Sequence, residues 1–330
     1  DVASSISLRT MSYRETMEAV DSARISAQDV SREQWLADRV WRIGGSQAAA
    51  ACGICPYTSR FTLYHQLRGT PLDVVETEPM RVGKRYEAAL LDDYEDRSGR
   101  SVRHWPQTIS VVHPDIPWMS CTPDALQWCD RRQSAGLGQC KWVGERMAHQ
   151  WPESDDEPGK LQSIPDHVMC QVQHEMTVCG SDWTTVVVMI GGQKLLWLDV
   201  EYDAELAAQI TRAEEQLLDD VKHGREPQAD GSESTAAMIR ALYPRDNGTT
   251  ITLGPEWQAL AARLDADKEA ASELAERIAG YETQLKAAIG EATRAEIGDV
   301  AYTYKQQTRR SYTVAEATFR ALRKVKGRGK

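Results

Sequence analysis

The sequence contains no run of the roughly 18 to 20 uncharged apolar residues that a membrane-spanning helix requires. Its first residues, 1–15, are polar and carry charges of both signs, so no signal peptide is predicted. These absences predict a soluble, cytoplasmic protein without a membrane partner. The composition, 41% hydrophobic and 27% charged over 330 residues, is that of a globular core domain with an appendage.

A second pair of cysteines at zinc-binding spacing is also missing. Cys52 and Cys55 form one Cys-x-x-Cys pair, but no second pair follows, and a structural zinc ion takes four ligands. The seven cysteines are therefore interpreted as free thiols of a reducing compartment. A Gly-rich phosphate loop of the Walker type is absent as well, so ATP binding is not indicated.

Positive charge is scarce. The chain has 39 Lys and Arg against 49 Asp and Glu, a formal net charge of −10. Taken alone, this balance argues against a nucleic-acid partner, because phosphate binding depends on Lys and Arg. A basic channel inside an acidic exterior would reconcile the two. The last residues, 320–330, are basic, and they are interpreted either as a solvated end or as a contact with the DNA backbone.

The apolar periodicity predicts a mixed α/β fold. Helices are expected up to residue 99, a series of strands over 102–143, a helix over 165–179, two strands within 183–200 and a helix over 204–223. This order predicts a central mixed sheet flanked by helices.

Three regions are predicted along the chain. An N-terminal arm covers 1–30 and a core domain covers 31–228, which ends near a stretch rich in Pro, Gly and Ser. The remaining region, 229–330, carries an apolar seam from Leu260 to Ala292 that predicts a coiled coil or a long helical hairpin. Segments 300–305 and 311–314 are expected to form a small β-hairpin before the basic tail.

Four polar residues follow a pattern that points to chemistry. Glu87 lies in a predicted helix, Asp124 follows a strand, and Gln139 and Lys141 lie two residues apart on the next strand. Residues at i and i+2 of a strand face the same side, so both are expected to face Asp124. Phosphodiester hydrolysis needs carboxylates for Mg²⁺ or Mn²⁺ and a lysine that orients water or stabilises phosphate charge.

The residues around this pattern resemble a known family. The matching strings are Arg42-Ile43-Gly44-Gly45-Ser46, Ser59-Arg60-Phe61, Gly83 to Glu87, Thr122-Pro123-Asp124, the strand ending in Lys141, and Gln171-Val172-Gln173-His174. In this order, over 31–228, the chain resembles the lambda-exonuclease and YqaJ viral recombinase family of the PD-(D/E)xK nucleases. The resemblance implies a restriction-endonuclease-like core and a metal-dependent DNA exonuclease.

The resemblance also implies a biological setting. Such an enzyme resects double-stranded DNA ends, preferring the 5′ to 3′ direction, and leaves single strands for an annealing protein. A phage or prophage origin in a bacterial cell is implied, as is a homo-oligomer that can close into a ring around DNA.

The resemblance implies a role for individual residues. Glu87, Asp124 and the residue at 139 are expected to bind the metal. Lys141 is expected to be the catalytic lysine. The predicted DNA-binding residues are two glutamines on the helix beside the site and a pocket for the 5′-terminal phosphate: Gln171 and Gln173, and Arg39, Ser46, Thr122 and Arg146.

Gln139 departs from the family, which has Glu at this position. An amide oxygen can bind Mg²⁺, but it brings no negative charge and cannot act as a base. Three explanations are open. The Gln is a deliberate exchange that traps substrate, or a natural enzyme tolerates it with weaker metal binding, or cleavage has been lost while DNA binding is retained.

Ordinary interpretations compete with this prediction. Singly, Glu87 fits a surface ion pair, Asp124 a turn residue and Lys141 a solvated cation. Their order and strand parity favour the site. Two other functional classes stay open: a DNA-binding recombination-accessory protein that does not cleave, which Gln139 favours, and a coiled-coil assembly protein, which the seam favours.

Overall fold

The computed structural model describes residues 7–27, 41–72, 76–308, 316 and 320–324. The chain divides into two compact units, Asp1–Tyr243 and Pro244–Lys330. Each unit is described here by itself.

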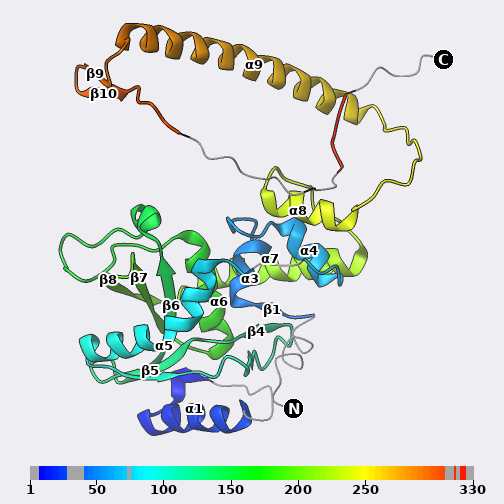
Figure 1. The fold of residues 1–330 in the computed structure, drawn as a ribbon. Coiled ribbons are helices and arrows are strands. Elements are labelled where there is room, and N and C mark those ends of the chain that lie inside the picture. The colour runs from blue at the N-terminus through cyan, green and yellow to red at the C-terminus, as the bar shows by residue number, and fades with distance from the viewer. Residues whose placement is uncertain (1–6, 28–40, 73–75, 309–315, 317–319, 325–330) are drawn as a thin grey trace. The chain divides into compact units, whose positions relative to one another are not determined.

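A five-stranded mixed sheet is the centre of the first unit (Figure 1). Its strands, in spatial order, are β2 (Ser101–His104), β5 (Ala125–Cys129), β6 (Ser134–Val143), β7 (Trp183–Ile190) and β8 (Lys194–Glu201). Strands β6 and β7 are parallel, and the other neighbours are antiparallel. The predicted α/β fold with a mixed sheet flanked by helices is confirmed.

Helices cover both faces of this sheet. Helix α5 (Glu78–Ser98) packs Leu90, Leu91 and Tyr94 on one face, and its end is set by Gly99, whose φ of 66° is left-handed. Helix α6 (Asp166–Cys179) packs Val168, Val172 and Met176 on the other. Both helices place apolar residues three and four positions apart, which aligns them on one side of each helix.

Successive side chains of β6 point alternately toward these two helices. Leu137 belongs to the core beneath α6, and a Cβ built on Gly138 would lie 3.8 Å from Leu91 Cδ2 of α5. Odd-numbered residues of β6 therefore face α6 and even-numbered residues face α5, because successive strand side chains alternate.

Further elements of the first unit surround the α6 face. A three-stranded sheet has the order β1 (Ile43–Gly44), β4 (Met119–Cys121) and β3 (Val111–Val112). The helical elements are η1 (Leu8–Thr10), α1 (Tyr13–Ala27), α3 (Gly45–Ala51), α4 (Arg60–Leu67), η2 (Glu145–Gln150) and α7 (Ala204–His223). A fully buried ion pair, His174 Nδ1 to Glu214 Oε1 at 2.7 Å, joins α6 to α7.

The first unit extends past the predicted boundary at residue 228. Helix α8 (Glu233–Leu242) begins at Ser232, whose hydroxyl accepts from the Thr235 backbone N–H. Thr235 Oγ1 donates to Ser59 Oγ at 2.7 Å, and Met238 is fully buried. The structural division therefore falls after Tyr243, since α8 is anchored to α4 by these contacts.

The second unit contains one long helix and a β-hairpin. Helix α9 (Glu256–Ile289) is continuous over 34 residues, and none of its residues is buried. The predicted C-terminal helical appendage is confirmed, but it is one continuous helix and not the helical hairpin that was the alternative. Its pairing into a coiled coil stays a prediction. Strand β9 (Arg294–Ile297) pairs with β10 (Val300–Thr303). The partner of 300–303 thus precedes it, whereas the predicted partner, 311–314, lies outside the described residues.

None of the described helices has both the length and the apolar character needed to cross a membrane.

Candidate catalytic and metal site

Asp124 lies immediately before β5, opposite Gln139 on β6. Its Oδ2 accepts hydrogen bonds from Gln139 Nε2 at 2.5 Å and from the Cys140 backbone N–H at 2.7 Å. Burial raises the pKa of Asp124, and the charge of Lys141 and these two hydrogen bonds only partly oppose that effect. The carboxyl group of Asp124 is therefore buried, and burial favours its neutral form unless a cation lies beside it.

Lys141 faces the same side of β6 as Gln139. Lys141 Nζ donates to Gln171 Oε1 at 2.8 Å, and Gln171 Nε2 donates to Gln139 Oε1 at 3.0 Å. One side chain of α6 therefore contacts both strand residues, as the spacing of two predicts. Trp142 points the other way, where it stacks on Tyr86 of α5 with ring centroids 5.5 Å apart.

Glu87 comes to the site from α5. Burial and the negative charge of Asp124 raise the pKa of Glu87 to about 7, and the charge of Lys141 opposes this rise. Gln107 Nε2 donates to Glu87 Oε1 at 3.3 Å. Because Glu87, Asp124 and Lys141 act on one another electrostatically, the structure brings the three predicted residues to one place.

Glu175 was not predicted from the sequence, and it also lies here. It is on α6, one turn after Gln171, and Gln171 Nε2 donates to its Oε1 at 2.9 Å. Burial and the charge of Asp124 raise the pKa of Glu175 to about 7. The available signal was the i, i+4 spacing from Gln171 together with a charged residue inside an otherwise buried stretch of helix.

Gln173 is not part of this group. Its Nε2 donates to the Glu201 backbone O at 2.9 Å, and its Oε1 accepts from the Asp203 backbone N–H at 3.0 Å. Two residues along a helix correspond to about 200° of rotation, so Gln173 points away from Gln171. Its position, buried and fixing the end of β8 to the start of α7, does not support the predicted contact with DNA.

The predicted pocket for a 5′-phosphate is only partly described. Arg39 lies outside the described residues. Ser46 is exposed on α3, and Arg146 is exposed on η2. Thr122 is half-buried, two residues before Asp124, with its Oγ1 3.2 Å from Ser110 Oγ. A shared phosphate pocket formed by these residues stays a prediction.

The donors at the site suit a hard divalent cation, which prefers oxygen ligands. They are the carboxylates of Asp124, Glu87 and Glu175 and the amide of Gln139. Over the part of the chain that the structure describes, no three His, Cys, Asp or Glu side chains are already gathered as a ligand set. Two of the carboxylates nevertheless have a raised pKa near 7, and a bound cation would stabilise their charged forms.

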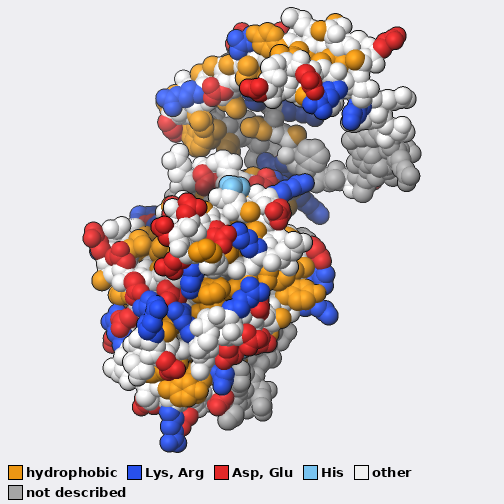
Figure 2. All heavy atoms as spheres, turned by 90° about the vertical axis from the view of Figure 1, so that its left-hand side faces the viewer, with side chains coloured by type: hydrophobic (Ala, Val, Ile, Leu, Met, Phe, Trp, Pro, Cys, Tyr) orange, Lys and Arg blue, Asp and Glu red, His pale blue; other side chains and the backbone are white. Residues whose placement is uncertain are grey.

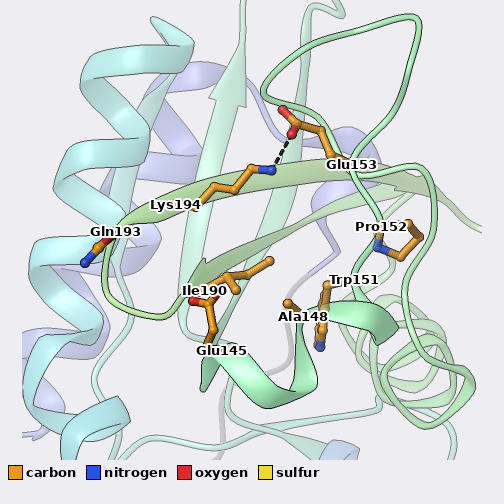
Figure 3. Close-up of a pocket in the computed structure, with 8 residues that line it drawn as sticks. All are labelled: Glu145, Ala148, Trp151, Pro152, Glu153, Ile190, Gln193 and Lys194. Carbon is orange, nitrogen blue, oxygen red and sulfur yellow. Dashed lines mark ion pairs between the residues drawn. The ribbon is translucent and has the colours of Figure 1, made fainter. Parts of the chain in front are cut away.

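A separate hollow of about 380 Å³ lies between η2 and the β7–β8 hairpin. Figure 3 shows Glu145, Trp151 and Ile190 around it, and an ion pair between Lys194 and Glu153 at its rim. None of the predicted site residues lines this hollow. Among the described residues that line this hollow, the only cation, Lys194, is paired with Glu153. The residues where β5 and β6 meet therefore point more clearly to a function.

Acidic and basic side chains are interspersed over the face of the molecule shown in Figure 2. The net charge of −10 is therefore not gathered into a single acidic field on that face.

Fold and site together define an α/β protein whose mixed sheet gathers two acids and a lysine where β5 and β6 meet. Residues 34–182 match the family model of the YqaJ-like viral recombinase domain. The family predicted from the sequence motifs is thus confirmed.

Individual similar proteins add detail. The chain is 26% identical over 282 residues to the uncharacterized protein YqaJ of Bacillus subtilis (strain 168). This alignment covers 84% of each of the two chains. Two crystal structures of LHK-Exo are also similar. One is its complex with dAMP, with TM-score 0.47 and 20% identity. The other is described as an alkaline exonuclease from Laribacter hongkongensis, with TM-score 0.44 and 19% identity. Each covers 58% of this chain and 93% of its own, and similarity at this level assigns no activity.

Proposed function

We propose that the protein is a metal-dependent DNA exonuclease that resects double-stranded ends and prefers the 5′ to 3′ direction. The observation that carries the proposal is the chain of hydrogen bonds that links Asp124, through Gln139 and Gln171, to Lys141. Glu87 is close enough for the charges of Asp124 and Lys141 to shift its pKa. The YqaJ-like viral recombinase domain over 34–182 supports it. Single strands left by resection would serve an annealing protein.

Phosphodiester hydrolysis requires charge stabilisation around a phosphate and an activated water. A bound Mg²⁺ or Mn²⁺ would polarise the phosphate and lower the pKa of water. Glu87 and Asp124 would hold the cation through carboxylate oxygens, with the Gln139 amide oxygen beside them. Lys141, kept in place by its hydrogen bond to Gln171, would orient the water or stabilise charge on the phosphate.

The preference for a 5′ end is proposed from Ser46, Thr122, Arg39 and Arg146. A phosphate-binding pocket combines hydroxyl groups with guanidinium groups, which bind phosphate in a two-pronged manner. A homo-oligomeric ring around DNA would place a basic channel inside an exterior with net negative charge.

The test is degradation of linear duplex DNA with 5′-phosphate ends in Mg²⁺ or Mn²⁺. We expect metal-dependent nucleotide release, slower release from 5′-hydroxyl ends, and none from closed circular duplex. Asp124→Asn is expected to abolish release while the protein stays folded. If the wild-type protein and Gln139→Glu are both folded and both leave the linear duplex intact, the enzyme proposal is wrong.

Gln139 favours a second candidate, a DNA-binding recombination-accessory protein that does not cleave. Its neutral amide donates to Asp124, so this carboxyl group has a hydrogen-bond partner without a cation. This candidate predicts salt-sensitive DNA binding with no turnover even after Gln139→Glu. The degradation assay on that variant separates the two candidates.

A further inference from the structure

Glu175 is a buried acid with an unpaired oxygen. Its residue is only 2% exposed, and its Oε2 has no hydrogen-bond partner among the described residues. A buried, unpaired carboxylate oxygen is costly. Glu214, the neighbouring buried acid, differs because its other oxygen pairs with the His174 imidazole at 2.7 Å. Glu175 forms no ion pair with any residue that the structure describes.

A single amide connects Glu175 to the rest of the site. Gln171 Nε2 donates both to Gln139 Oε1, at 3.0 Å, and to Glu175 Oε1, at 2.9 Å. Gln171 Oε1 accepts from Lys141 Nζ at 2.8 Å. The carboxylate of α6 and the amide of β6 are therefore two ends of one hydrogen-bonded group, and Lys141 binds the oxygen of the Gln171 amide that connects them.

The backbone of α3 leaves space for this carboxylate. A Cβ built on Gly45 would lie 2.5 Å from Glu175 Oε1 and 2.8 Å from its Cγ. Any side chain at 45 would thus have to displace the acid. The absence of a side chain at Gly45 therefore lets α3 pack directly against the carboxylate of Glu175 on α6.

We propose that Glu175 is the third acid of the cation site, and that it supplies from α6 the negative charge that Gln139 does not supply from β6. Its unpaired Oε2 is the atom that takes the cation or a water bound to it. The inference rests on the proposed function. It explains how a chain with a neutral residue at 139 retains three carboxylates, Glu87, Asp124 and Glu175, around one divalent ion.

The test is calorimetric titration of the full chain with Mn²⁺, without DNA. Glu175→Gln is nearly isosteric, and we expect it to weaken Mn²⁺ binding about 10- to 100-fold, the range usual for groups that support a metal site. The exchanged pair Gln139→Glu with Glu175→Gln restores three acids and is expected to recover affinity to within about threefold. Glu153→Gln, in the separate hollow, is the matched control and is expected to leave affinity unchanged.

Two further measurements keep the outcomes distinct. Melting of each variant in EDTA shows that it is folded, and the rise in melting temperature on adding Mn²⁺ gives a second measure of binding. If Asp124→Asn loses binding but Glu175→Gln binds as the wild type, Glu175 is not a third acid, whereas the proposed metal site stands. If Asp124→Asn also binds as the wild type, the metal site itself is misplaced and the proposed function fails with it. An exchanged pair as weak as Glu175→Gln alone would overturn the idea that the two positions substitute for each other.

Discussion

The hydrogen bond between Gln139 and Asp124 determines how the site behaves without a metal. Gln139 Nε2 donates to Asp124 Oδ2 at 2.5 Å in a buried position. In Gln139→Glu, two carboxylates would face each other there, and like charges in a dry site repel. We therefore expect this variant to lose roughly 1–3 kcal/mol of unfolding free energy in EDTA, the usual cost of an unsatisfied buried polar group.

Added Mn²⁺ should reverse that loss, because the new carboxylate is a better cation ligand than the amide. Urea denaturation with EDTA and with Mn²⁺ measures both effects. Equal stability of the two proteins in EDTA would mean that the amide of Gln139 does not stabilise Asp124.

In the proposed function Lys141 acts on the phosphate, and we expect it to contribute little to the stability of the fold. Its described contact is the hydrogen bond to Gln171 Oε1. We predict that Lys141→Met lowers the rate of DNA degradation by about 10²- to 10³-fold, the range for loss of one preorganised charge-stabilising donor. Mn²⁺ affinity should change little, since an ammonium is not a ligand.

Single-turnover degradation assays measure the rate, and calorimetry measures the affinity. Lys222→Met, at the end of α7, is the matched control that removes a lysine away from the site. A Lys141→Met protein that degrades DNA at the wild-type rate would remove Lys141 from the chemistry.

A half-buried ion pair connects Arg100, just after the end of α5, to Asp199 of β8. Arg100 Nη1 and Nη2 donate to Asp199 Oδ1 and Oδ2 at 2.7 and 2.6 Å, and Arg100 Nη1 also donates to Tyr94 and Thr185. The side chains of Arg100 and Asp199 are only 12% and 21% exposed. Asp199→Asn would leave the half-buried guanidinium without its counter-charge, and we expect this to cost about 1–3 kcal/mol of unfolding free energy.

The same pair predicts a pH dependence. Burial alone would raise the pKa of Asp199, but the hydrogen bond and charge of Arg100 outweigh it, so the pKa is lowered. A lowered pKa stabilises the fold above the unfolded value, near pH 4, and that stability is lost as the pH falls through the folded value.

Asp199→Asn should therefore lose less stability on acidification than the wild type. Urea denaturation between pH 3 and pH 6 checks this. The exposed pair of Arg9 and Asp182 provides the control, because Asp182→Asn is expected to cost under about 1 kcal/mol. Parallel pH profiles for wild type and Asp199→Asn would contradict the argument.

The elements that the sequence predicts well are those with a sustained period. The predicted helices over 165–179 and 204–223 correspond to α6 and α7, since each is bounded by a glycine and carries a continuous apolar face. The sheet β1-β4-β3 was not foreseen as a unit, because strands of two or three residues are too short to show a period.

The candidate site divides in the same way. Strand parity was enough to place Gln139 and Lys141 together, and they do share Gln171. The i, i+4 spacing from Gln171 places Glu175 on the same side of α6, but only the packing of α6 shows that this acid is buried and close enough to Asp124 to feel its charge. Gln173 was assigned from the family resemblance, although the helical turn places it on a different side of α6 from Gln171.

The whole molecule divides where α8 ends, and truncation tests this. The unit Asp1–Tyr243 includes α8, whose Met238 is fully buried and whose Thr235 donates to the buried Ser59. A chain ending at Tyr243 retains these contacts. We expect it to melt within about 2 °C of the full chain, because α9 contributes no buried residues of its own.

A chain ending at Gln228 should be clearly less stable. Loss of Met238 removes about 2 kcal/mol of apolar burial, and loss of Thr235 and Ser234 removes the partners of Ser59 and Thr62 at about 1 kcal/mol. Together, roughly 3 kcal/mol corresponds to a melting temperature about 6–12 °C lower for a unit of this size. Calorimetry of the two truncated chains decides where the core ends. Equal melting temperatures would place its end at 228, where the linker-like composition alone places it. They would also mean that α8 packs on α4 without stabilising the first unit.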